Sequence, residues 1–471
     1  MRKKNYLLLY PMMGIAFVVV IAILIGHYCF GCFTDKTQWR QDATVFEAVV
    51  ISPTVKHNKV VSCDLQVVNI NGEGEGKKIS AAFFPDEMGI FPHFKIGDGI
   101  IVKSKIERDT TKYARREMHG HTLIFNGNWR RKVICLTSLS DWDRTRIRML
   151  QLRESLLERL HTNLNDSGYP IIAAMTLGDK SNLSKETKQL FSQTGVSHVL
   201  ALSGLHIGLI FFFLSILITP LFPTIRSRRI AHAFIVIPIW MFVLLVGMPV
   251  SAIRSATMIT IYAITTASGR GKVPFNTLCF AAVVILIVSP LSLFDIGFQL
   301  SFLSVAGIIV CYPILYETIN QQWLIKHGKA SKIWSMTCIS VTAQLSTFPL
   351  VAYYFGTFST YFLVANYVIV PLTTVILYIT IIYFLAMPIA FLQHIIGMFL
   401  SGIAWFMTAF LGYLSSLPGA TISDLHPDKI EVSMLYLVVI LFFSWWNRNN
   451  AKRAELLLSA ILLLICYSTL T

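Results

Sequence analysis

Residues 197–219 read SHVLALSGLHIGLIFFFLSILIT, and this stretch decides the class of fold. It contains no Asp, Glu, Lys or Arg, and a run of about 20 apolar residues spans a bilayer as a helix. Similar runs recur through a chain that is 54% hydrophobic and 14% charged, whereas about a quarter of a soluble domain is charged. The sequence therefore predicts a polytopic α-helical membrane protein.

We expect about 10–11 membrane spans. Their expected positions are 7–30, 197–219, 230–247, 251–267, 274–289, 296–316, 334–354, 361–385, 389–416, 432–446 and 455–470. Basic residues precede the first span, which places the N-terminus in the cytoplasm by the positive-inside rule. Strict alternation then puts the other basic loops inside and the acidic loops near 290–295 and 418–431 outside. Residues 1–33 are expected to remain as an uncleaved anchor, because no small-residue cleavage site follows the span.

Residues 34–137 differ in composition and predict a small extracytoplasmic β-barrel of the OB type. Five runs have the alternating or β-branched pattern of strands, at 43–51, 59–70, 77–84, 98–106 and 130–136. A long connection before the last run is typical of this fold, and its loop often contacts nucleic acid. The candidate contacts for single-stranded DNA are Arg108, Lys112, Arg115 and Arg116, which lie among aromatic residues. An ordinary solvated loop is the alternative.

Two cysteines of this domain, Cys63 and Cys135, are a candidate disulfide because the segment is expected outside the cytoplasm. Two unpaired strand cysteines remain equally open. Residues 138–194 follow as amphipathic, interfacial helices. Ser140 is the expected N-cap of the first of them, whose apolar stripe is expected to comprise Met149, Leu152, Leu156 and Leu160.

Residues 195–446 form the expected main transmembrane domain, followed by a cytoplasmic loop and a final apolar helix over 447–471. Near its start, His198 and His206 would lie about 12 Å apart along a straight helix, so no shared metal ion is expected. Ser203 and His206 are close enough to touch, but no G-x-S-x-G elbow or nearby acidic partner supports a hydrolase. The alternatives are hydrogen-bonded histidines on a packing face, or histidines facing a watery cavity. The small residues expected on that face are Ser197, Ala201, Gly204 and Gly208.

Further polar residues fall inside expected spans or, in the case of Asp295, directly before one, and an ionisable group at such a place is by default a functional candidate. They include Arg254, Asp295, Gln299 and Asn366. A second set of small residues comprises Gly297, Ser301, Ser304 and Gly307. Together these positions favour a transport path over a bundle filled only with apolar side chains. If His206, Arg254, Asp295 and Gln299 line one path, they should border a common polar cavity.

Residues 178–210, GDKSNLSKETKQLFSQTGVSHVLALSGLHIGLI, resemble the signature of the ComEC family of DNA-uptake channels. The resemblance covers residues 170–445. Further matches follow in order along the chain, at Arg254-Ser255, Gly269-Arg270, Ser289-Pro290, the run from Asp295 to Ser301, Pro349, Asn366 and Pro371. The resemblance implies transport of single-stranded DNA across the bacterial inner membrane during natural transformation, without a cofactor. It also implies an extracytoplasmic DNA receptor and a cytoplasmic helicase-like motor as partners.

The same resemblance makes eight residues candidates for the pore or the family motifs. They are Asp179, His198, Ser203, His206, Arg254, Asp295, Gln299 and Asn366. Many family members also carry a metallo-β-lactamase-type domain, but no H-x-H-x-D-H cluster occurs here. We therefore expect a form that lacks this domain, with a separate nuclease supplying any strand degradation. The alternative functions are an intramembrane hydrolase using Ser203 and His206, or a related solute transporter not used for DNA.

Overall fold

The structure is a computed structural model of the whole chain. It describes residues 44–52, 54–57, 60–70, 78–83, 94–104, 122–124, 129–131, 140–267, 274–448 and 451–470. The expected first span, the basic residues Arg108, Lys112, Arg115 and Arg116, and Cys135 lie outside the described residues. The chain divides into two compact units. One contains the strands, the helix that follows them and Trp240–Pro249; the other contains Asn163–Ile239 and Val250–Thr471.

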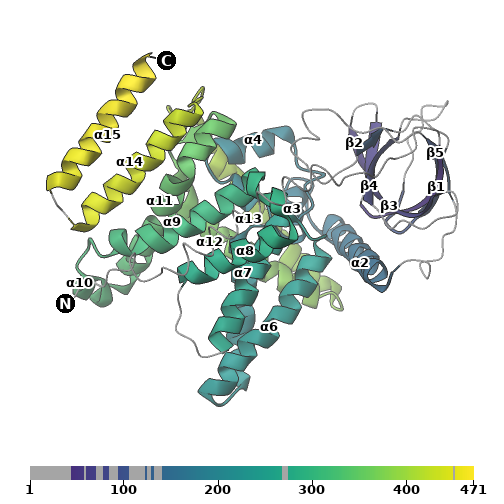
Figure 1. Cartoon of the computed structure of the whole chain (residues 1–471). Helices are drawn as coiled ribbons and strands as arrows, with labels where there is room; N and C mark the ends of the chain where they lie inside the picture. Colours follow the sequence, from purple (N-terminus) through teal and green to yellow (C-terminus); the bar gives the residue numbers. More distant parts are fainter. Residues whose placement is uncertain are drawn as a thin grey trace. The chain divides into compact units, whose positions relative to one another are not determined.

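The strands of the first unit form one mixed sheet (Figure 1). Its strands are β1 (Thr44–Val50), β2 (Val55–His57), β3 (Val60–Ile70), β4 (Lys78–Phe83), β5 (Gly99–Ser104), β6 (Thr122–Ile124) and β7 (Trp129–Arg131). The order is β6-β4-β3-β1-β5-β7, with β2 paired to β3. The β4–β6 pair is parallel, and the other pairs are antiparallel. Four of the five expected strands coincide with β1, β3, β4 and β5, whereas the fifth is described only as far as Arg131.

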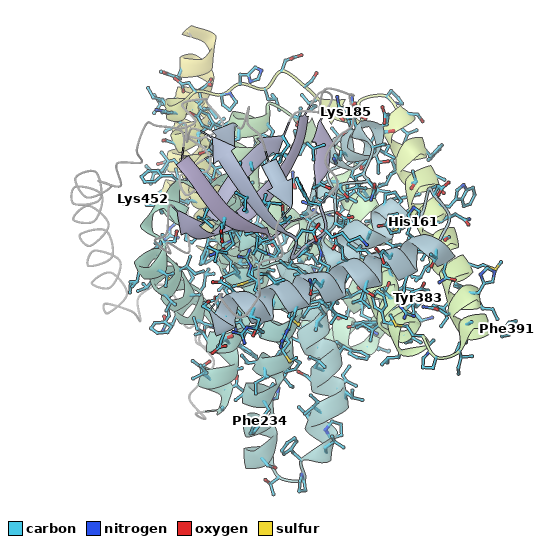
Figure 2. All side chains as sticks on the ribbon, turned by 90° about the vertical axis from the view of Figure 1, so that its right-hand side faces the viewer. His161, Lys185, Phe234, Tyr383, Phe391 and Lys452 are labelled. Carbon is cyan, nitrogen blue, oxygen red and sulfur yellow. The ribbon has the colours of Figure 1, made fainter. Side chains whose placement is uncertain are left out.

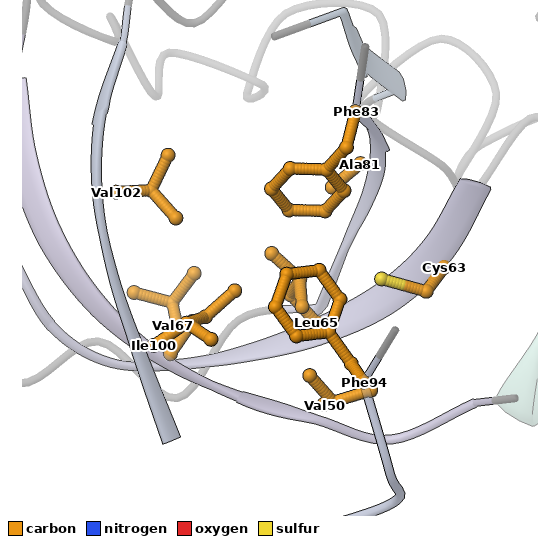
Figure 3. Packing of buried hydrophobic residues seen from close by; sticks show 10 residues of the cluster. Val50, Cys63, Leu65, Val67, Ala81, Phe83, Phe94, Ile100 and Val102 are labelled. Carbon is orange, nitrogen blue, oxygen red and sulfur yellow. The ribbon is translucent and has the colours of Figure 1, made fainter. Parts of the chain in front are cut away.

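Successive side chains of β3 alternate between its two faces, so Cys63, Leu65 and Val67 all point into one apolar core (Figure 3). The rings of Phe83 and Phe94 meet edge to face there, with their centroids 5.1 Å apart. Cys63 is a free cysteine in the described part of the chain and packs as a small apolar side chain. Its candidate partner Cys135 lies outside the described residues, so the pairing of the two stays a prediction. Burial raises the pKa of the Cys63 thiol to about 12, which keeps it protonated and unreactive at neutral pH.

Helix α2 (Asp141–Asn163) begins where the sequence predicts, because the Ser140 hydroxyl accepts a hydrogen bond from the Asp143 amide at 3.2 Å. The expected apolar stripe is right at Leu160, which is fully buried, but is displaced in the first half of the helix. Leu152 is 48% exposed, whereas Ile147 and Leu150 are buried and pack with apolar residues of the sheet unit. Packing against the sheet therefore decides which face of this helix is covered.

The second unit is helical. Its longer helices are α3 (Tyr169–Leu177), α4 (Lys185–Gln193), α5 (Gly204–Ile218), α6 (Ile225–Leu245, whose last turns belong to the first unit), α7 (Val250–Ala267), α8 (Pro274–Val288), α9 (Ile296–Tyr316), α11 (Gly328–Phe355), α12 (Phe362–Leu385), α13 (Ala390–Ser416), α14 (Lys429–Arg448) and α15 (Ala451–Leu470). Short elements connect them, namely the 3₁₀ helices η2 (Ser197–Val199), η3 (Thr219–Leu221) and η4 (Pro290–Phe294), helix α10 (Gln321–Lys326), and the paired strands β8 (Phe358–Ser359) and β9 (Thr421–Ile422).

Six of the described helical segments are long and apolar enough to cross a membrane, and two shorter apolar stretches lie within α6 and α8. The chain is accordingly a multi-pass membrane protein. Large apolar side chains point outward from these helices, as Phe234 and Phe391 do in Figure 2, whereas Tyr383 is fully buried. Helices α7 and α15 lie where spans are expected, but they are not among the six segments that are long and apolar enough to cross a membrane.

The expected span 197–219 is wrong at its start. Residues 197–199 form the short helix η2, and the membrane helix α5 begins only at Gly204. The small residues of 197–208 therefore do not share one helix face. A methyl group added at Gly204 would lie 3.2 Å from the Ser255 hydroxyl, whereas one added at Gly208 would have no described neighbour within 4 Å.

Small residues do allow close packing between α9 and α11, which lie side by side (Figure 1). A methyl group at Gly307 would overlap the Ser346 side chain and lie 3.1 Å from the Thr342 carbonyl oxygen. Helix α3 is the other tightly packed element. Its residues from Ile171 to Leu177 are buried, and it packs against α12 and α13.

These contacts predict opposite results for two glycine substitutions. Gly307→Ala should separate α9 from α11 and destabilise the protein, by about 1–3 kcal/mol as for an overpacked core. Gly208→Ala is the matched control, since it adds the same methyl group in open space and improves helix propensity by up to about 1 kcal/mol. Thermal unfolding in detergent measures both. Equal stability of the two variants would contradict the α9–α11 contact.

Candidate functional site

Ser203 and His206 touch, as their spacing predicts, at the first turn of α5. The Ser203 hydroxyl lies 3.1 Å from His206 Nδ1, and the Ser203 backbone amide donates to the same nitrogen at 3.3 Å. Ser203 is the N-cap of α5, and the two residues form a reciprocal capping box. Such a pair satisfies backbone N–H groups that otherwise have no partner inside the helix.

This geometry explains the pair without nucleophilic catalysis. His206 is fully buried, and its Nε2 has no hydrogen-bond partner among the described residues. A catalytic serine–histidine pair needs a third group that orients the imidazole through its second nitrogen. The described residues provide no such group. The contact is therefore that of a helix cap. It leaves His206 Nε2, a buried ring nitrogen, without a hydrogen-bond partner among the described residues.

Arg254 and Asp295 form an ion pair between α7 and the start of α9. Arg254 lies on α7 and is buried, with 5% of its surface exposed, and its Nη1 donates to Asp295 Oδ2 at 2.9 Å. Asp295 is the N-cap of α9, where its carboxylate accepts hydrogen bonds from the amides of Gly297 at 3.2 Å and Phe298 at 3.0 Å. One carboxylate thus begins α9 and neutralises a charge on α7.

Gln299 extends this polar contact along α9. Its Nε2 donates to the Leu293 carbonyl at 2.9 Å, and its Oε1 accepts from the Tyr354 hydroxyl of α11 at 3.1 Å. Both ends of the amide are thereby engaged. The polar residues predicted at 295 and 299 therefore connect three helices, α7, α9 and α11, close to the connection before α9.

The start of α5 lies against the same helix, α7. The Ser251 hydroxyl donates to the Leu202 carbonyl at 2.6 Å, and Gly204 faces Ser255. Helix α7 therefore contacts the capped start of α5 on one side and, through Arg254, the capped start of α9. A single cavity bordered by all four residues expected on the path stays a prediction.

The remaining candidates lie elsewhere in the helical unit. Asp179 is buried in the turn after α3, where its carboxylate accepts from the Ser181 hydroxyl at 2.8 Å. His198 is an exposed residue of η2. Asn366 lies on α12, and its amide oxygen is buried with no partner among the described residues. The structure does not place these three in the contact of Arg254 with Asp295.

Sequence reasoning missed Tyr354, Ser251 and the role of Gly297. A tyrosine or serine in an apolar span carries no signal of its own. Gly297 was expected as a small packing residue, but a methyl group there would lie 3.1 Å from Arg254 Nη2, so the guanidinium occupies the space. Within the part of the chain that the structure describes, no group of three His, Cys, Asp or Glu side chains is placed to hold a metal ion.

These features define a multi-pass helical membrane protein with charged and polar groups buried between its helices. Residues 175–449, which include α5, α7, α9 and α11, match the family described as Competence protein. The chain therefore belongs to the competence protein family. No solved structure matches it.

Three relatives share similarity over about half of the chain. ComE operon protein 3 of Bacillus subtilis is 26% identical over 247 residues, which are 52% of this chain and 30% of the relative. An uncharacterised protein of Aquifex aeolicus is 27% identical over 248 residues, 52% of this chain and 56% of that protein. Recombination protein 2 of Haemophilus influenzae is 24% identical over 220 residues, 44% and 27% of the two chains. The chain thus spans less than two thirds of each relative.

The capping box predicts which changes at Ser203 are tolerated. Ser203→Ala removes the acceptor for the first turn of α5 and should destabilise the protein by about 1 kcal/mol, whereas Ser203→Asn keeps a capping oxygen and should have little effect. Thermal unfolding in detergent distinguishes the variants. An equal loss in both would show that the cap is not what Ser203 provides.

Proposed function

We propose that this chain conducts single-stranded DNA across the bacterial cytoplasmic membrane during natural transformation. The observation that carries the proposal is the match of residues 175–449 to the competence protein family. The ion pair of buried Arg254 with the half-exposed Asp295 lies within these residues. A strand that bears one charge per nucleotide needs a polar route through an apolar barrier. Polar and charged groups inside a membrane unit mark such routes.

The arrangement of the helices supports this proposal. Their outer surfaces expose large apolar residues, as a lipid environment requires. Between them lie the Arg254–Asp295 ion pair, the amide of Gln299 and the unused nitrogen of His206. Asp179, His198 and Asn366 remain candidate family-motif residues in this proposal.

We also propose that the sheet unit is an extracytoplasmic barrel of the OB type. Strands β6 and β7 are the two ends of the strand path, yet only residues 125–128 separate them in sequence. The five Cα–Cα steps from Ile124 to Trp129 span at most about 18 Å. A sheet whose two end strands are joined by so short a segment is expected to curl until its ends approach each other, and this supports a closed barrel. Parallel pairing of β4 with β6 next to antiparallel neighbours agrees with an OB topology.

In this barrel, the connection between β5 and β6 would carry the DNA contacts Arg108, Lys112, Arg115 and Arg116. An extracytoplasmic DNA receptor would deliver the strand, and a cytoplasmic helicase-like motor would receive it. Helix α2, with Trp142 and Leu152 exposed, would lie at the membrane surface next to this domain.

Deletion of the gene tests the proposed function. Transformation with chromosomal DNA should be abolished, while labelled DNA should still bind to the cell surface but remain sensitive to added nuclease. Complementation with the wild-type gene should restore nuclease-protected, internalised DNA. Normal transformation in the deletion strain would refute the proposal, and uptake of a small solute instead of DNA would favour a transporter.

Complementation with Ser203→Asn separates the channel from the hydrolase. This variant keeps the helix cap and removes the hydroxyl, so a channel should transform at close to the wild-type level. A catalytic serine would leave the variant as inactive as the deletion, although the folded protein is present in the membrane.

A further inference from the structure

Three donors converge on the carboxylate of Asp295. The amides of Gly297 and Phe298 donate from the first turn of α9, and Arg254 Nη1 donates from α7. Two successive amides at a helix N-terminus together with a guanidinium form a donor set that suits a phosphate group. A carboxylate of the protein itself occupies that set in this structure.

The guanidinium of Arg254 is short of acceptors. It carries five N–H groups, and among the described residues its one hydrogen-bond partner is Asp295. Its Nε is buried without a partner, and its Nη2 lies over the bare backbone of Gly297. Burying N–H groups of a charged side chain without acceptors is unfavourable. A phosphodiester has two charged oxygens, as a carboxylate does, and two ester oxygens in addition, so it offers this guanidinium more acceptors than Asp295 does.

The two partners differ in access. The Arg254 side chain is 6% exposed, and the Asp295 side chain is 44% exposed. The carboxylate therefore lies on the open side of the donor set, with the guanidinium behind it. An incoming anion meets Asp295 first and has to displace it, because two anions on one donor set repel each other.

We propose that Arg254 and the N-terminus of α9 form a binding site for a phosphodiester of the translocated strand. Asp295 fills the site when no strand is present. This inference rests on the proposed function and adds where the strand is held and what competes with it. Exchange between the carboxylate and successive phosphates keeps each contact weak, as passage through a channel requires.

The test compares two aspartates that cap helices. Asp295→Asn keeps an N-cap oxygen for Gly297 and Phe298 but removes the charge that competes with phosphate. Asp428→Asn is the matched control at the start of α14. Asp428 accepts from the Glu431 amide at 2.7 Å and from the Tyr467 hydroxyl at 2.8 Å, so its carboxylate is held by neutral donors instead of a guanidinium. Both variants change the net charge by the same amount.

The measurement is the affinity of the full-length protein for a fluorescent 20-nucleotide oligothymidylate between 50 and 400 mM NaCl. The protein is held in a maltoside detergent, which contains no phosphate. Asp295→Asn should tighten binding severalfold. It should also make the slope of log K against log[NaCl] more negative by about 0.7, which is the contribution of one phosphate of a single strand. Asp428→Asn should match the wild type, and Asp295→Asn combined with Arg254→Gln should lose the gain.

Several results would overturn the inference. Identical binding by Asp295→Asn and Asp428→Asn would show that Asp295 only caps its helix, and a gain that survives Arg254→Gln would place the site elsewhere. If the Arg254→Gln protein does not fold, Arg254→Lys, which keeps the charge without the fork of N–H groups, should lose part of the gain. If added phosphatidylglycerol erases the gain, the site belongs to a lipid headgroup.

Failure of the proposed function gives a different pattern. Neither the wild type nor Asp295→Asn would then bind the oligonucleotide at any salt concentration. Binding by the wild type without a difference between the two aspartate variants would refute only the phosphate site.

Discussion

A guanidinium buried among membrane helices needs an anion within reach, and the contact of Arg254 with Asp295 meets this need. The same carboxylate caps α9, so the start of that helix and the neutralisation of α7 depend on one side chain. Gly297 belongs to the same contact, because a side chain there would displace the guanidinium. The relative positions of α7 and α9 therefore follow from the partner requirement of a single charge.

Other polar groups of the helical unit obey the same requirement. Backbone groups at the start of a helix have no partner within it, and lipid supplies none. At α5 the Ser203–His206 pair provides those partners, and at α9 the carboxylate of Asp295 does. Both helix starts lie against α7. The contacts of Ser203, Arg254 and Asp295 thus lie where helices begin, whereas farther along α9 close packing takes over at Gly307.

Much of this organisation could be predicted from the sequence, because length and apolar composition locate membrane helices and alternation locates strands. The start of α5 could not, since residues 197–203 carry no Asp, Glu, Lys or Arg and continue without a break into the apolar run of the helix that follows. Gly208 and Gly307 look alike in sequence, yet only the second contacts a neighbouring helix.

The candidate site was predicted as separate residues. Arg254 and Asp295 stand out as charges within apolar surroundings, but they lie 41 residues apart, and only the packing of α7 on α9 brings them together. For α2 the prediction fails in another way, since Leu152 was expected on the buried face of the helix and is exposed. Helical periodicity fits more than one stripe, and the sheet beside the helix selects the one that is buried.

Helix α3 has a consequence for how the protein is made. Its nine residues extend about 14 Å, roughly half the thickness of the hydrocarbon, so it cannot cross the membrane alone. The helices that cover it, α12 and α13, are synthesised much later in the chain. Until they emerge from the ribosome, α3 lacks these two neighbours, as it does in a chain truncated before α12. Biogenesis therefore includes the late enclosure of an early segment, and premature termination leaves that segment without the helices that enclose it.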